Sequence, residues 1–313
     1  MKSALIVGSG GQDGRLLRAH LEGQRYRVLG LDRRGVSAVG LEWSHPVDIT
    51  RFEAVQAVMQ AVRPDEVYHL AAIHHSSEER HVDDLPSFHR LYEVNFFSLL
   101  NFLEAARLVS PGSRIFFAAS SHVFGRPEGE IQDERTPLRP DSIYAMTKAD
   151  GLLACRLYRE THRLFASTGI LYPHESRYRD EKFLSMKIVR GAVRIKAGAQ
   201  RELVLGRLDA RVDWGSAEDT VEAMQRILGA PAAGEFVVST GKAHSVQDFV
   251  RVAFEAVGLD WQRYVREDPS LITREAPPRI GNPEKLKAAT GWSPGTGFES
   301  MIRALVRSAE AAP

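Results

Sequence analysis

The sequence has little cysteine, little net charge and no long apolar run. These three features argue against disulfides, against binding to nucleic acid or a membrane surface through overall charge, and against a membrane span. A single cysteine, Cys155, among 313 residues rules out a disulfide within the chain, so a reducing, cytoplasmic location is expected. The 41 basic and 40 acidic residues nearly cancel, which gives no overall attraction to nucleic acid or to a membrane surface. No stretch approaches the roughly 18 apolar residues of a membrane span, and the apolar run after Met1 is too short for the core of a signal peptide. We therefore expect a cytoplasmic globular protein with neither nucleic acid nor membrane as a partner.

The first half of the chain alternates short apolar runs with amphipathic segments. Apolar runs that predict buried strands lie at 4–8, 27–32, 65–72, 113–120 and 166–173. Segments with helical periodicity lie between them, at 14–23, 53–62, 88–109 and 142–162. Strands that alternate with helices predict an α/β fold, specifically a Rossmann-type doubly wound parallel sheet with right-handed crossovers.

The second half is less regular and predicts a smaller α/β lobe. Helices are expected at 181–198, 244–258, 283–292 and 297–310. The second of these opens with Ser245 and Asp248 in capping-box spacing. The length suggests about two domains. We expect a dinucleotide-binding domain at 1–173, to which 210–240 returns, and a substrate lobe at 174–209 and 241–313.

The stretch "GSGGQDG" predicts a phosphate-binding turn. It places Gly8, Gly11 and Gly14 between the first strand and the first helix. Glycine is needed where the backbone turns tightly and where phosphate approaches main-chain N–H groups. The helix that follows offers unpaired N–H donors and a partial positive charge. We therefore predict that this turn binds a dinucleotide.

The end of the second strand gives two opposite indications about that dinucleotide. Asp32 lies roughly 20 residues beyond the glycines, where an acid bonds the ribose 2′-hydroxyl of NAD. Arg33 and Arg34 follow directly, and arginine there accommodates the 2′-phosphate of NADP. Two further segments fit the same site: Asp48, placed to meet the adenine, and the small residues that end the next predicted strand, which let a cofactor lie close, namely Leu70, Ala71 and Ala72.

The stretch "YAMTK" predicts a proton-transfer site. Tyr144 and Lys148 lie one turn apart on the same face of the predicted helix. An ammonium near a phenol stabilises the phenolate and lowers its pKa toward the operating range. Such a phenolate takes a proton from a sugar hydroxyl while hydride passes to nicotinamide, and Ser120, at the end of the preceding strand, can bond the same hydroxyl. We predict Ser120, Tyr144 and Lys148 as a catalytic set.

The segment "IHHSSEERH" raises the possibility of a metal site. It gathers His74, His75, Glu78, Glu79 and His81, and His and Glu are zinc ligands. Because the segment directly follows a predicted strand, a solvated or substrate-facing loop is favoured and no metal is predicted. Cys155 lies on an apolar helix face and is interpreted as a core residue.

Together these motifs resemble the extended short-chain dehydrogenase/reductase family (NAD-dependent epimerases and dehydratases), and most nearly its GDP-mannose 4,6-dehydratase branch. The resemblance covers almost the whole chain and rests on "GSGGQDG", "VRPDEVYHLAA", "SIYAMTK", "GILYPHES", "LVLGRLDARVDWG", "STGKAHSV" and "GNPEKLKAATGW". It implies a GDP-linked sugar in the C-terminal lobe and bound NADP, with NAD as the alternative. It also implies a homodimer or homotetramer in which the helices at 88–109 and 142–162 form a four-helix bundle between subunits.

The resemblance extends the set of expected site residues. Further cofactor contacts are implied for Gln12, Asp13, Ile49, Tyr172 and His174. Substrate contacts are implied for Ser121, Glu175, Arg179, Lys187, Arg207, Arg211 and Glu275, and the sugar could also meet His75 or Ser76.

The sequence departs from that branch at three places. The dehydratases have Thr, then Ser or Asp, then a Glu base where this chain has Ser120, Ser121 and His122. Pro173 replaces the Asn of an N-H-E-S run, and Val212 replaces an Arg that meets the diphosphate. Arg211, Arg207 or Arg179 could partly compensate for that arginine.

Because His122 stands where the dehydratases have their Glu base, the sequence is compatible with more than one reaction. Hydride exchange at C4 needs only Ser120, Tyr144 and Lys148, which favours a 4-keto reductase or an epimerase. A neutral imidazole is also a competent base, so a dehydratase that uses His122 is the alternative. A non-catalytic dinucleotide sensor would have no need of the phenolate. A 3,5-epimerase would need two further acid/base residues that the sequence does not single out.

Overall fold

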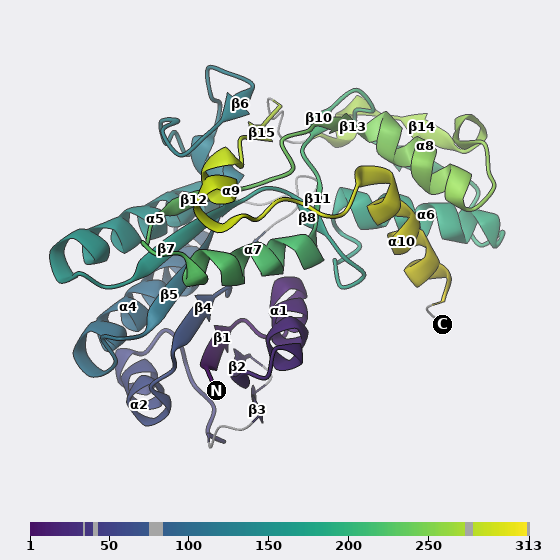
Figure 1. Ribbon diagram of the computed structural model, residues 1–313. Coiled ribbons are helices and arrows are strands. Elements are labelled where there is room, and N and C mark those ends of the chain that lie inside the picture. The colour runs from purple at the N-terminus through teal and green to yellow at the C-terminus, as the bar shows by residue number, and fades with distance from the viewer. Residues whose placement is uncertain (34, 40–42, 75–83, 273–277, 312–313) are drawn as a thin grey trace.

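The computed structural model describes residues 1–33, 35–39, 43–74, 84–272 and 278–311. Figure 1 shows a larger lobe built around one sheet and a smaller, mainly helical lobe beside it. The predicted residues Arg34, His75, Ser76 and Glu275 lie outside the described residues.

The larger lobe contains a seven-stranded sheet in the order β12-β7-β5-β4-β1-β2-β3. Its strands are β1 (Ser3–Val7), β2 (Arg27–Asp32), β3 (Gly35–Val39), β4 (Glu66–His69), β5 (Arg114–Ser120), β7 (Ala166–Leu171) and β12 (Glu235–Val238). Every pair is parallel except β2 with β3. The predicted Rossmann-type α/β class is thereby confirmed. The antiparallel direction of the edge strand β3 was not predicted from the sequence.

Helices cover both faces of the sheet, because alternate strand residues point to opposite sides. Leu5 and Val7 of β1 face the core under α2 (Phe52–Val62), α4 (Ser98–Val109) and α5 (Ile143–His162). Ala4 and Ile6 face α1 (Gln12–Gly23), α7 (Ala217–Gly229) and α9 (Glu284–Thr290). Cys155 is fully buried in the first of these cores, and burial raises the pKa of its thiol to about 12.

The helix predicted at 88–109 is a longer composite of three segments. It consists of α3 (Leu85–Tyr92), a π-helical segment (Glu93–Phe97) and α4. It begins before residue 88 because the Asp84 carboxylate caps it, accepting a hydrogen bond from the backbone N–H of Ser87 at 2.9 Å. The helix predicted at 142–162 begins at Ile143, since Ser142 is its cap.

The smaller lobe packs three helices around its own core. These are α6 (Leu184–Lys196), α8 (Val246–Ala256) and α10 (Phe298–Glu310), so each predicted helix is present but shorter. The Ser245–Asp248 capping box is confirmed. Paired short strands complete the lobe: β9 (Leu203–Leu205) with β14 (Val265–Glu267), and β10 (Arg211–Val212) with β13 (His244–Ser245). Short 3₁₀ turns lie at Trp261–Arg263 and Pro269–Leu271.

The chain crosses between the lobes more often than the sequence indicated. Two short strand pairs lie at the junction: β6 (Ile131–Gln132) with β15 (Ile280–Gly281), and β8 (His174–Glu175) with β11 (Gly215–Ser216). The expected division places α9 in the substrate lobe, whereas Leu286 and Trp292 pack in the core beneath the sheet. Conversely, β10 lies within the 210–240 segment expected on the sheet, and it pairs with the smaller lobe.

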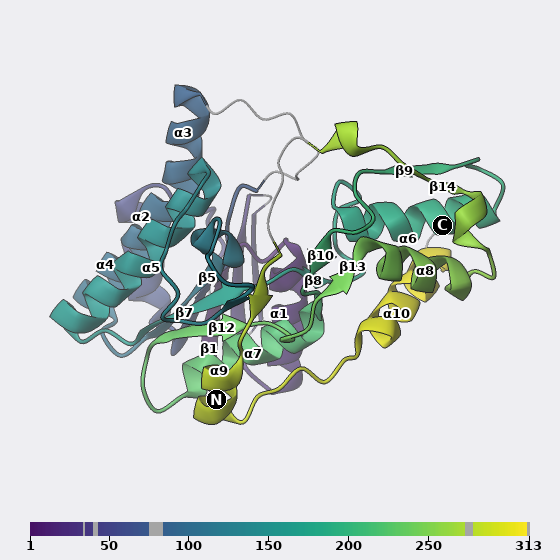
Figure 2. The ribbon, with the colours of Figure 1, turned by 90° about the horizontal axis from the view of Figure 1, so that it is seen from above.

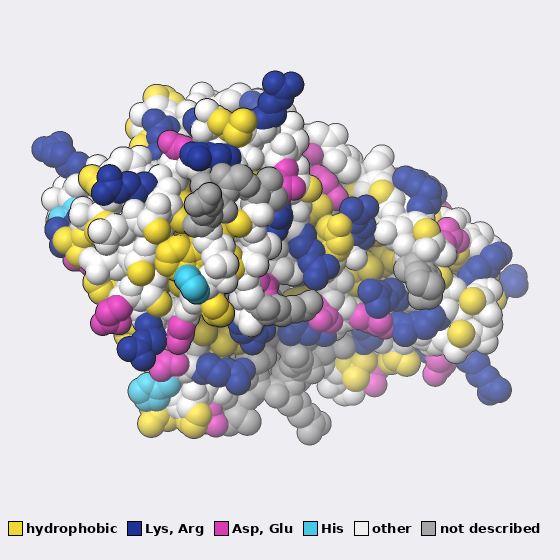
Figure 3. Space-filling view, turned by 90° about the horizontal axis from the view of Figure 1, so that it is seen from below, with side chains coloured by type: hydrophobic (Ala, Val, Ile, Leu, Met, Phe, Trp, Pro, Cys, Tyr) yellow, Lys and Arg dark blue, Asp and Glu magenta, His cyan; other side chains and the backbone are white. Residues whose placement is uncertain are grey.

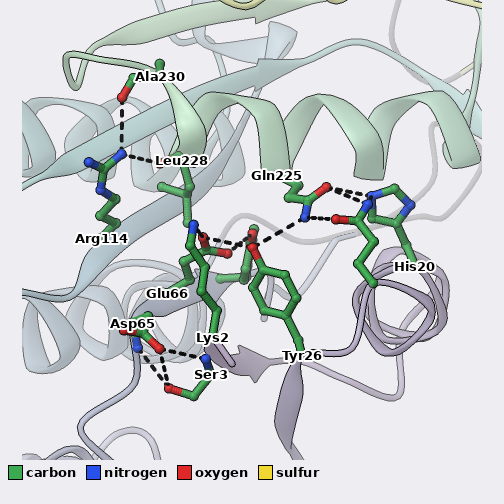
Figure 4. Close-up of polar contacts among 12 residues, drawn as sticks. Lys2, Ser3, His20, Tyr26, Asp65, Glu66, Arg114, Gln225, Leu228 and Ala230 are labelled. Atoms are coloured by element: carbon green, nitrogen blue, oxygen red, sulfur yellow. Dashed lines mark hydrogen bonds and ion pairs between the residues drawn. The ribbon is translucent and has the colours of Figure 1, made fainter.

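A polar network ties α7 to the amino ends of the strands (Figure 4). Buried Glu66 accepts hydrogen bonds from Lys2 Nζ at 2.9 Å and from the Tyr68 hydroxyl at 2.7 Å. Arg114 donates to the backbone oxygens of Leu228 and Ala230, at 2.7 and 3.1 Å. The network holds the amino edge of the sheet, while the predicted site residues lie at the opposite, carboxyl edge, where open α/β sheets bind their ligands.

Candidate active site

The glycine turn is built for close backbone approach. Gly8 has φ +93°, and a Cβ added there would lie 2.8 Å from the backbone nitrogen of Ala71. A Cβ on Gly14 would lie 2.6 Å from Ser9 Cα. α1 begins at Gln12, directly after Gly11, so its first N–H groups face the turn. The predicted dinucleotide turn therefore has the geometry that a phosphate-binding loop requires.

The residues expected around the adenosine are only partly placed at this turn. The Asp32 carboxylate reaches the turn so closely that a Cβ on Gly10 would collide with it, while Arg33 is exposed. Asp48 instead accepts hydrogen bonds from the backbone and hydroxyl of Thr50, at 3.0 and 2.7 Å, which lower the pKa of its carboxyl. Ile49 packs against the sheet core.

The carboxyl end of β4 lies directly beside the glycines. The strand ends at His69, before the predicted 72, and the backbone N–H of Leu70 donates to Val7 oxygen at 2.9 Å. Ala71 lies against Gly8, and Ala72 is exposed.

An ion pair joins the start of α1 to the smaller lobe. His174 Nε2 lies 3.0 Å from both carboxylate oxygens of Asp13, and its Nδ1 lies 2.6 Å from the backbone oxygen of Tyr172. Although burial opposes both charges, the pairing lowers the pKa of Asp13 and raises that of His174. Gln12 adds a hydrogen bond to His174 oxygen at 3.1 Å and accepts one from the Ser176 hydroxyl at 3.0 Å.

The side chain of Tyr172 is directed away from this pair. It is 3% exposed, and its hydroxyl donates to Gln132 Oε1 at 2.9 Å. Burial raises its pKa far above the ordinary value. A cofactor contact by this residue therefore falls to its backbone.

Ser120, Tyr144 and Lys148 come together where β5 ends and α5 begins. Ser120 lies close enough to Tyr144 for its hydroxyl to act on the pKa of the phenol. Lys148, 2% exposed, donates from Nζ to Ala118 oxygen at 2.7 Å, and its Nζ lies 5.9 Å from the centre of the Tyr144 ring. The structure thus assembles the three predicted residues at the carboxyl edge of the sheet.

The protonation states of this set differ from the expectation. Burial raises the pKa of Tyr144 to about 12, with the Ser120 hydrogen bond acting against it. Burial also lowers the pKa of Lys148 to about 7. The expected lowering of the Tyr144 pKa is therefore absent, because desolvation outweighs the opposing effects of Ser120 and Arg179.

His122 lies against Tyr144 from a 3₁₀ turn, Ser121–Phe124. Its ring centre is 5.8 Å from that of Tyr144 at an interplanar angle of 84°. Its backbone N–H donates to the Ser120 hydroxyl at 3.3 Å. Ser121, expected to contact substrate, is buried at 3% exposure.

Two residues that were not predicted as site residues complete this cluster. His74, just beyond β4, has its ring centre 4.4 Å from that of Tyr144 and 5.9 Å from that of His122. Phe183, which caps α6, stacks on His74 at 5.6 Å and 14°. His74 had been noted only as a possible metal ligand; its place at the carboxyl end of a central strand is the signal that could have found it. Nothing in the sequence marks Phe183.

The expected lobe residues Glu175 and Arg179 approach the same cluster. Arg179 places its guanidinium 3.7 Å from the centre of the Phe183 ring, and its Nε lies 3.5 Å from Glu175 Oε2. Its charge also acts to lower the pKa of Tyr144. Glu175 is 3% exposed and accepts a hydrogen bond from the Ser185 hydroxyl at 2.6 Å, and burial raises its pKa.

The remaining predicted substrate residues lie farther out on the smaller lobe. Arg207 donates to Asp209 at 2.9 and 2.6 Å beside an open cavity of about 600 Å³. The cavity is lined by Arg207, Leu208, Asp209, Gln247, Glu267, Pro269 and Ile272. Arg211 lies 3.9 Å from Glu130, and Lys187 lies partly buried on α6. Lys and Arg side chains gather along the boundary between the lobes in Figure 3, a charge distribution suited to a diphosphate.

Two classes of feature are missing from the part of the chain that the structure describes. No three His, Cys, Asp or Glu side chains there come close enough together to hold a metal ion. His75, Glu78, Glu79 and His81 of the candidate metal loop lie outside that part. Within the same residues, no helix combines the length and apolarity needed to cross a membrane.

Comparison with known proteins now decides the family. The model of the GDP-mannose 4,6 dehydratase family matches residues 5–305. The chain belongs to this family. GDP-mannose 4,6 dehydratase 2 of Arabidopsis thaliana is 36% identical over 97% of this chain and 86% of its own. The chain is thus a member of the nucleotide-sugar branch of the NAD(P)-dependent short-chain dehydrogenase/reductases, as the sequence motifs predicted.

Solved structures confirm the fold of this family member. RMD from Pseudomonas aeruginosa, complexed with NADPH, superposes with a TM-score of 0.83 at 20% identity, covering 99% of both chains. UDP-glucose 4-epimerase of Thermus thermophilus, complexed with NAD, gives 0.82 at 25% identity, covering 99% of this chain and 100% of its own. These neighbours share the architecture of this chain, and the likeness shows the fold rather than the reaction.

Proposed function

We propose that this protein transfers hydride at C4 of a GDP-linked hexose, as a 4-keto reductase or a 4-epimerase, and binds NADP, with NAD as the alternative. One observation carries the proposal: Ser120, Tyr144 and Lys148 are assembled where β5 ends and α5 begins, while the neighbouring dehydratase Glu is replaced by His122, which packs on Tyr144. Hydride exchange at C4 needs the first three side chains and no base directed at C5.

The chain's own groups provide binding and proton transfer. Tyr144 and Ser120 lie close to each other, so their hydroxyls are placed to hold the C4 oxygen between them. Tyr144 gives that oxygen a proton in reduction and takes it back in oxidation. Lys148, with Nζ on Ala118 oxygen, is placed to hold the nicotinamide ribose. The bound dinucleotide supplies or accepts the hydride.

Groups that bind the phosphates of cofactor and substrate are expected on both lobes. The open turn at Gly8 and the first N–H groups of α1 would hold the pyrophosphate of the dinucleotide. Asp32 at the turn favours NAD, and exposed Arg33 favours NADP. The structural neighbour crystallised with NADPH is consistent with the second. Arg179 and Arg207 are the candidate contacts for the sugar diphosphate.

The second candidate is 4,6-dehydration with His122 as the base. It is favoured by the activity for which the family and its curated relatives are named. An imidazole can carry a proton as a carboxylate can, but it differs in shape, and a misplaced base forfeits about 10²–10⁴-fold in rate. The first proposal is preferred because hydride transfer at C4 requires no proton transfer by His122.

Exposed apolar side chains on α4 and α5 support a homodimer through these helices, or a homotetramer that contains it. Leu108 of α4 and Leu153 and Leu157 of α5 are each close to half exposed or more, at 47, 46 and 55%. Figure 2 shows the two helices side by side on the flank of the larger lobe, away from the smaller one. Large exposed apolar groups that gather on one face mark an association surface. Light scattering should give at least twice the chain mass, and Leu153→Glu together with Leu157→Glu should reduce it to one chain.

The test compares two incubations. Purified protein with GDP-mannose and NADP is followed by mass spectrometry, and protein with GDP-4-keto-6-deoxymannose and NADPH is followed by absorbance. A 4-keto reductase would oxidise NADPH in the second incubation, and neither a reductase nor a 4-epimerase would remove water in the first. A 4-keto-6-deoxy product from GDP-mannose would instead establish the dehydratase alternative.

A further inference from the structure

The 3₁₀ turn Ser121–Phe124 is followed by a buried glycine in left-handed backbone. Gly125 has φ +54°, and a Cβ added there would lie 1.8 Å from the backbone oxygen of Arg139. The Gly125 N–H donates to the backbone oxygen of His122 at 3.0 Å, and the Arg139 N–H donates to that of Val123 at 2.9 Å. The chain before α5 therefore lies tightly against the turn, and the position of Gly125 is tied to that of His122.

One arginine from far along the chain reaches the same glycine. Arg279 Nη1 donates to the backbone oxygen of Gly125 at 3.3 Å. The Arg279 side chain is partly buried, and burial lowers the pKa of its guanidinium, whereas Asp141 and Tyr172 act to raise it. Asp141 directly precedes the cap of α5, the helix that carries Tyr144. Arg279 thus bonds the turn after β5 and lies within electrostatic reach of the start of α5.

The backbone that carries Arg279 is fixed in place. The N–H groups of Ile280 and Asn282 donate across the β6–β15 pair, at 3.0 and 2.8 Å. Between them, the Gly281 N–H donates to Oδ2 of the fully buried Asp213 at 3.2 Å. A side chain built on an anchored strand can hold a neighbouring segment precisely.

The charge of Arg279 is costly at this place. Taking a guanidinium out of water is unfavourable, and a hydrogen bond to one carbonyl offsets only part of that loss. An apolar side chain of similar length would fill the same space without the loss of hydration. What the arginine supplies in addition is the N–H donor that holds Gly125.

We infer that Arg279 is a positioning residue, which holds Gly125 and thereby keeps Ser120 and the turn after it in the geometry that hydride transfer at C4 requires. Ser120 caps this turn, since its hydroxyl accepts a hydrogen bond from the His122 N–H at 3.3 Å. A displaced turn would therefore move the hydroxyl that holds the C4 oxygen. Displacement of a reacting group by about 1 Å costs about 10²-fold in rate. The inference rests on the proposed function, because its kinetic effect is measured in that reaction.

Arg279→Met tests the inference, because methionine retains apolar length and lacks the donor. We expect kcat for NADPH oxidation with GDP-4-keto-6-deoxymannose to fall by about 10–100-fold, while KM for the sugar nucleotide keeps its wild-type value. Arg279→Lys restores one donor and should recover most of the loss. Arg135→Met is the matched control and should change neither constant, since the Arg135 side chain is 93% exposed and pairs with Asp133.

Hydrogen exchange provides a measurement that does not depend on turnover. The Gly125 amide, which donates to His122, should exchange faster in Arg279→Met than in the wild-type protein, because the turn is no longer held from the other side. The amides of β1 should keep their protection, which shows that the fold is intact. Arg279→Gln, which is polar but too short to reach the carbonyl, replaces the methionine variant if that protein does not fold.

The outcomes separate this inference from the proposed function. A wild-type kcat in the variant that lacks the donor would overturn the inference. A loss confined to KM would also overturn it, because it would show that Arg279 contacts the substrate instead. An unchanged exchange rate at Gly125 would overturn it as well. A wild-type protein that does not oxidise NADPH would contradict the proposed 4-keto reductase, and exchange at Gly125 would then decide whether Arg279 holds the turn.

Discussion

The two sides of the active site are built in different ways. Ser120, Tyr144 and Lys148 belong to β5 and α5, and Lys148 is almost completely buried. His74 and His122 lie on a loop and a 3₁₀ turn, and their rings lie against the ring of Tyr144. The strand and helix carry the three side chains proposed for hydride transfer. The loop and the turn carry the two histidines, and residues in such segments can change the reaction without disturbing the sheet.

The largest expected loss of activity follows substitution in the set on β5 and α5. Tyr144→Phe removes the proton donor at the C4 oxygen and should lower kcat for NADPH oxidation by about 10²–10⁴-fold. Tyr158→Phe is the matched control, because Tyr158 is on the same helix but bonds Glu104 at 3.0 Å. Steady-state kinetics checks both variants. An equal loss in both would show that the helix, rather than the Tyr144 hydroxyl, matters.

A side chain added in the glycine turn is expected to lower both stability and cofactor affinity. Gly8→Ala forces a side chain into left-handed backbone and against Ala71, and should cost about 2–4 kcal/mol of unfolding free energy together with cofactor affinity. Gly112→Ala is the control, since no atom lies within 4 Å of its added Cβ. Urea unfolding and cofactor titration measure both effects. A Gly8→Ala protein as stable as Gly112→Ala would contradict the close approach at Ala71.

Lys148 is expected to be needed for turnover although its burial destabilises the folded protein. Folding lowers its pKa from 10.5 to about 7, so the folded state binds this proton less readily than the unfolded chain does. The resulting penalty is complete below pH 7 and disappears as the pH rises toward 10.5. Lys148→Met should therefore raise the unfolding free energy at pH 7 by about 1–3 kcal/mol, after loss of the Ala118 hydrogen bond, while it abolishes turnover. A stabilisation that does not shrink between pH 7 and pH 10 would refute this.

The junction between the lobes should give the smallest effect. His174 has a raised pKa, so its contribution is complete below about pH 6.5 and is lost as the pH rises through the raised value. Asp13 has a lowered pKa, so its contribution is complete above about pH 3.8 and is lost at lower pH. Asp13→Asn should therefore destabilise the protein by about 1 kcal/mol between pH 4 and 6.5 and by less at pH 9. Chemical unfolding at several pH values checks the profile, and a cost that grows toward pH 9 would contradict it.

The same contrast explains what could be predicted from the sequence. The glycine turn and the Tyr144–Lys148 spacing are local sequence patterns, so both could be recognised without the structure; Gly8 lies against Ala71, and Lys148 Nζ lies 5.9 Å from the centre of the Tyr144 ring. The contact between His74 and Phe183 joins residues far apart in sequence that come from different lobes, and no local pattern encodes it. The pKa of Tyr144 was misjudged because burial depends on the whole packed site.

The most direct test of the account follows deuterium from labelled NADPH. The protein is given GDP-4-keto-6-deoxymannose and NADPH that carries deuterium at the transferable position of the nicotinamide, and the product is examined by NMR. For the 4-keto reductase, we predict a GDP-hexose with deuterium bonded to C4 and a hydroxyl in place of the ketone. An unchanged ketone, together with conversion of GDP-mannose to a 4-keto-6-deoxy product by the same sample, would contradict it.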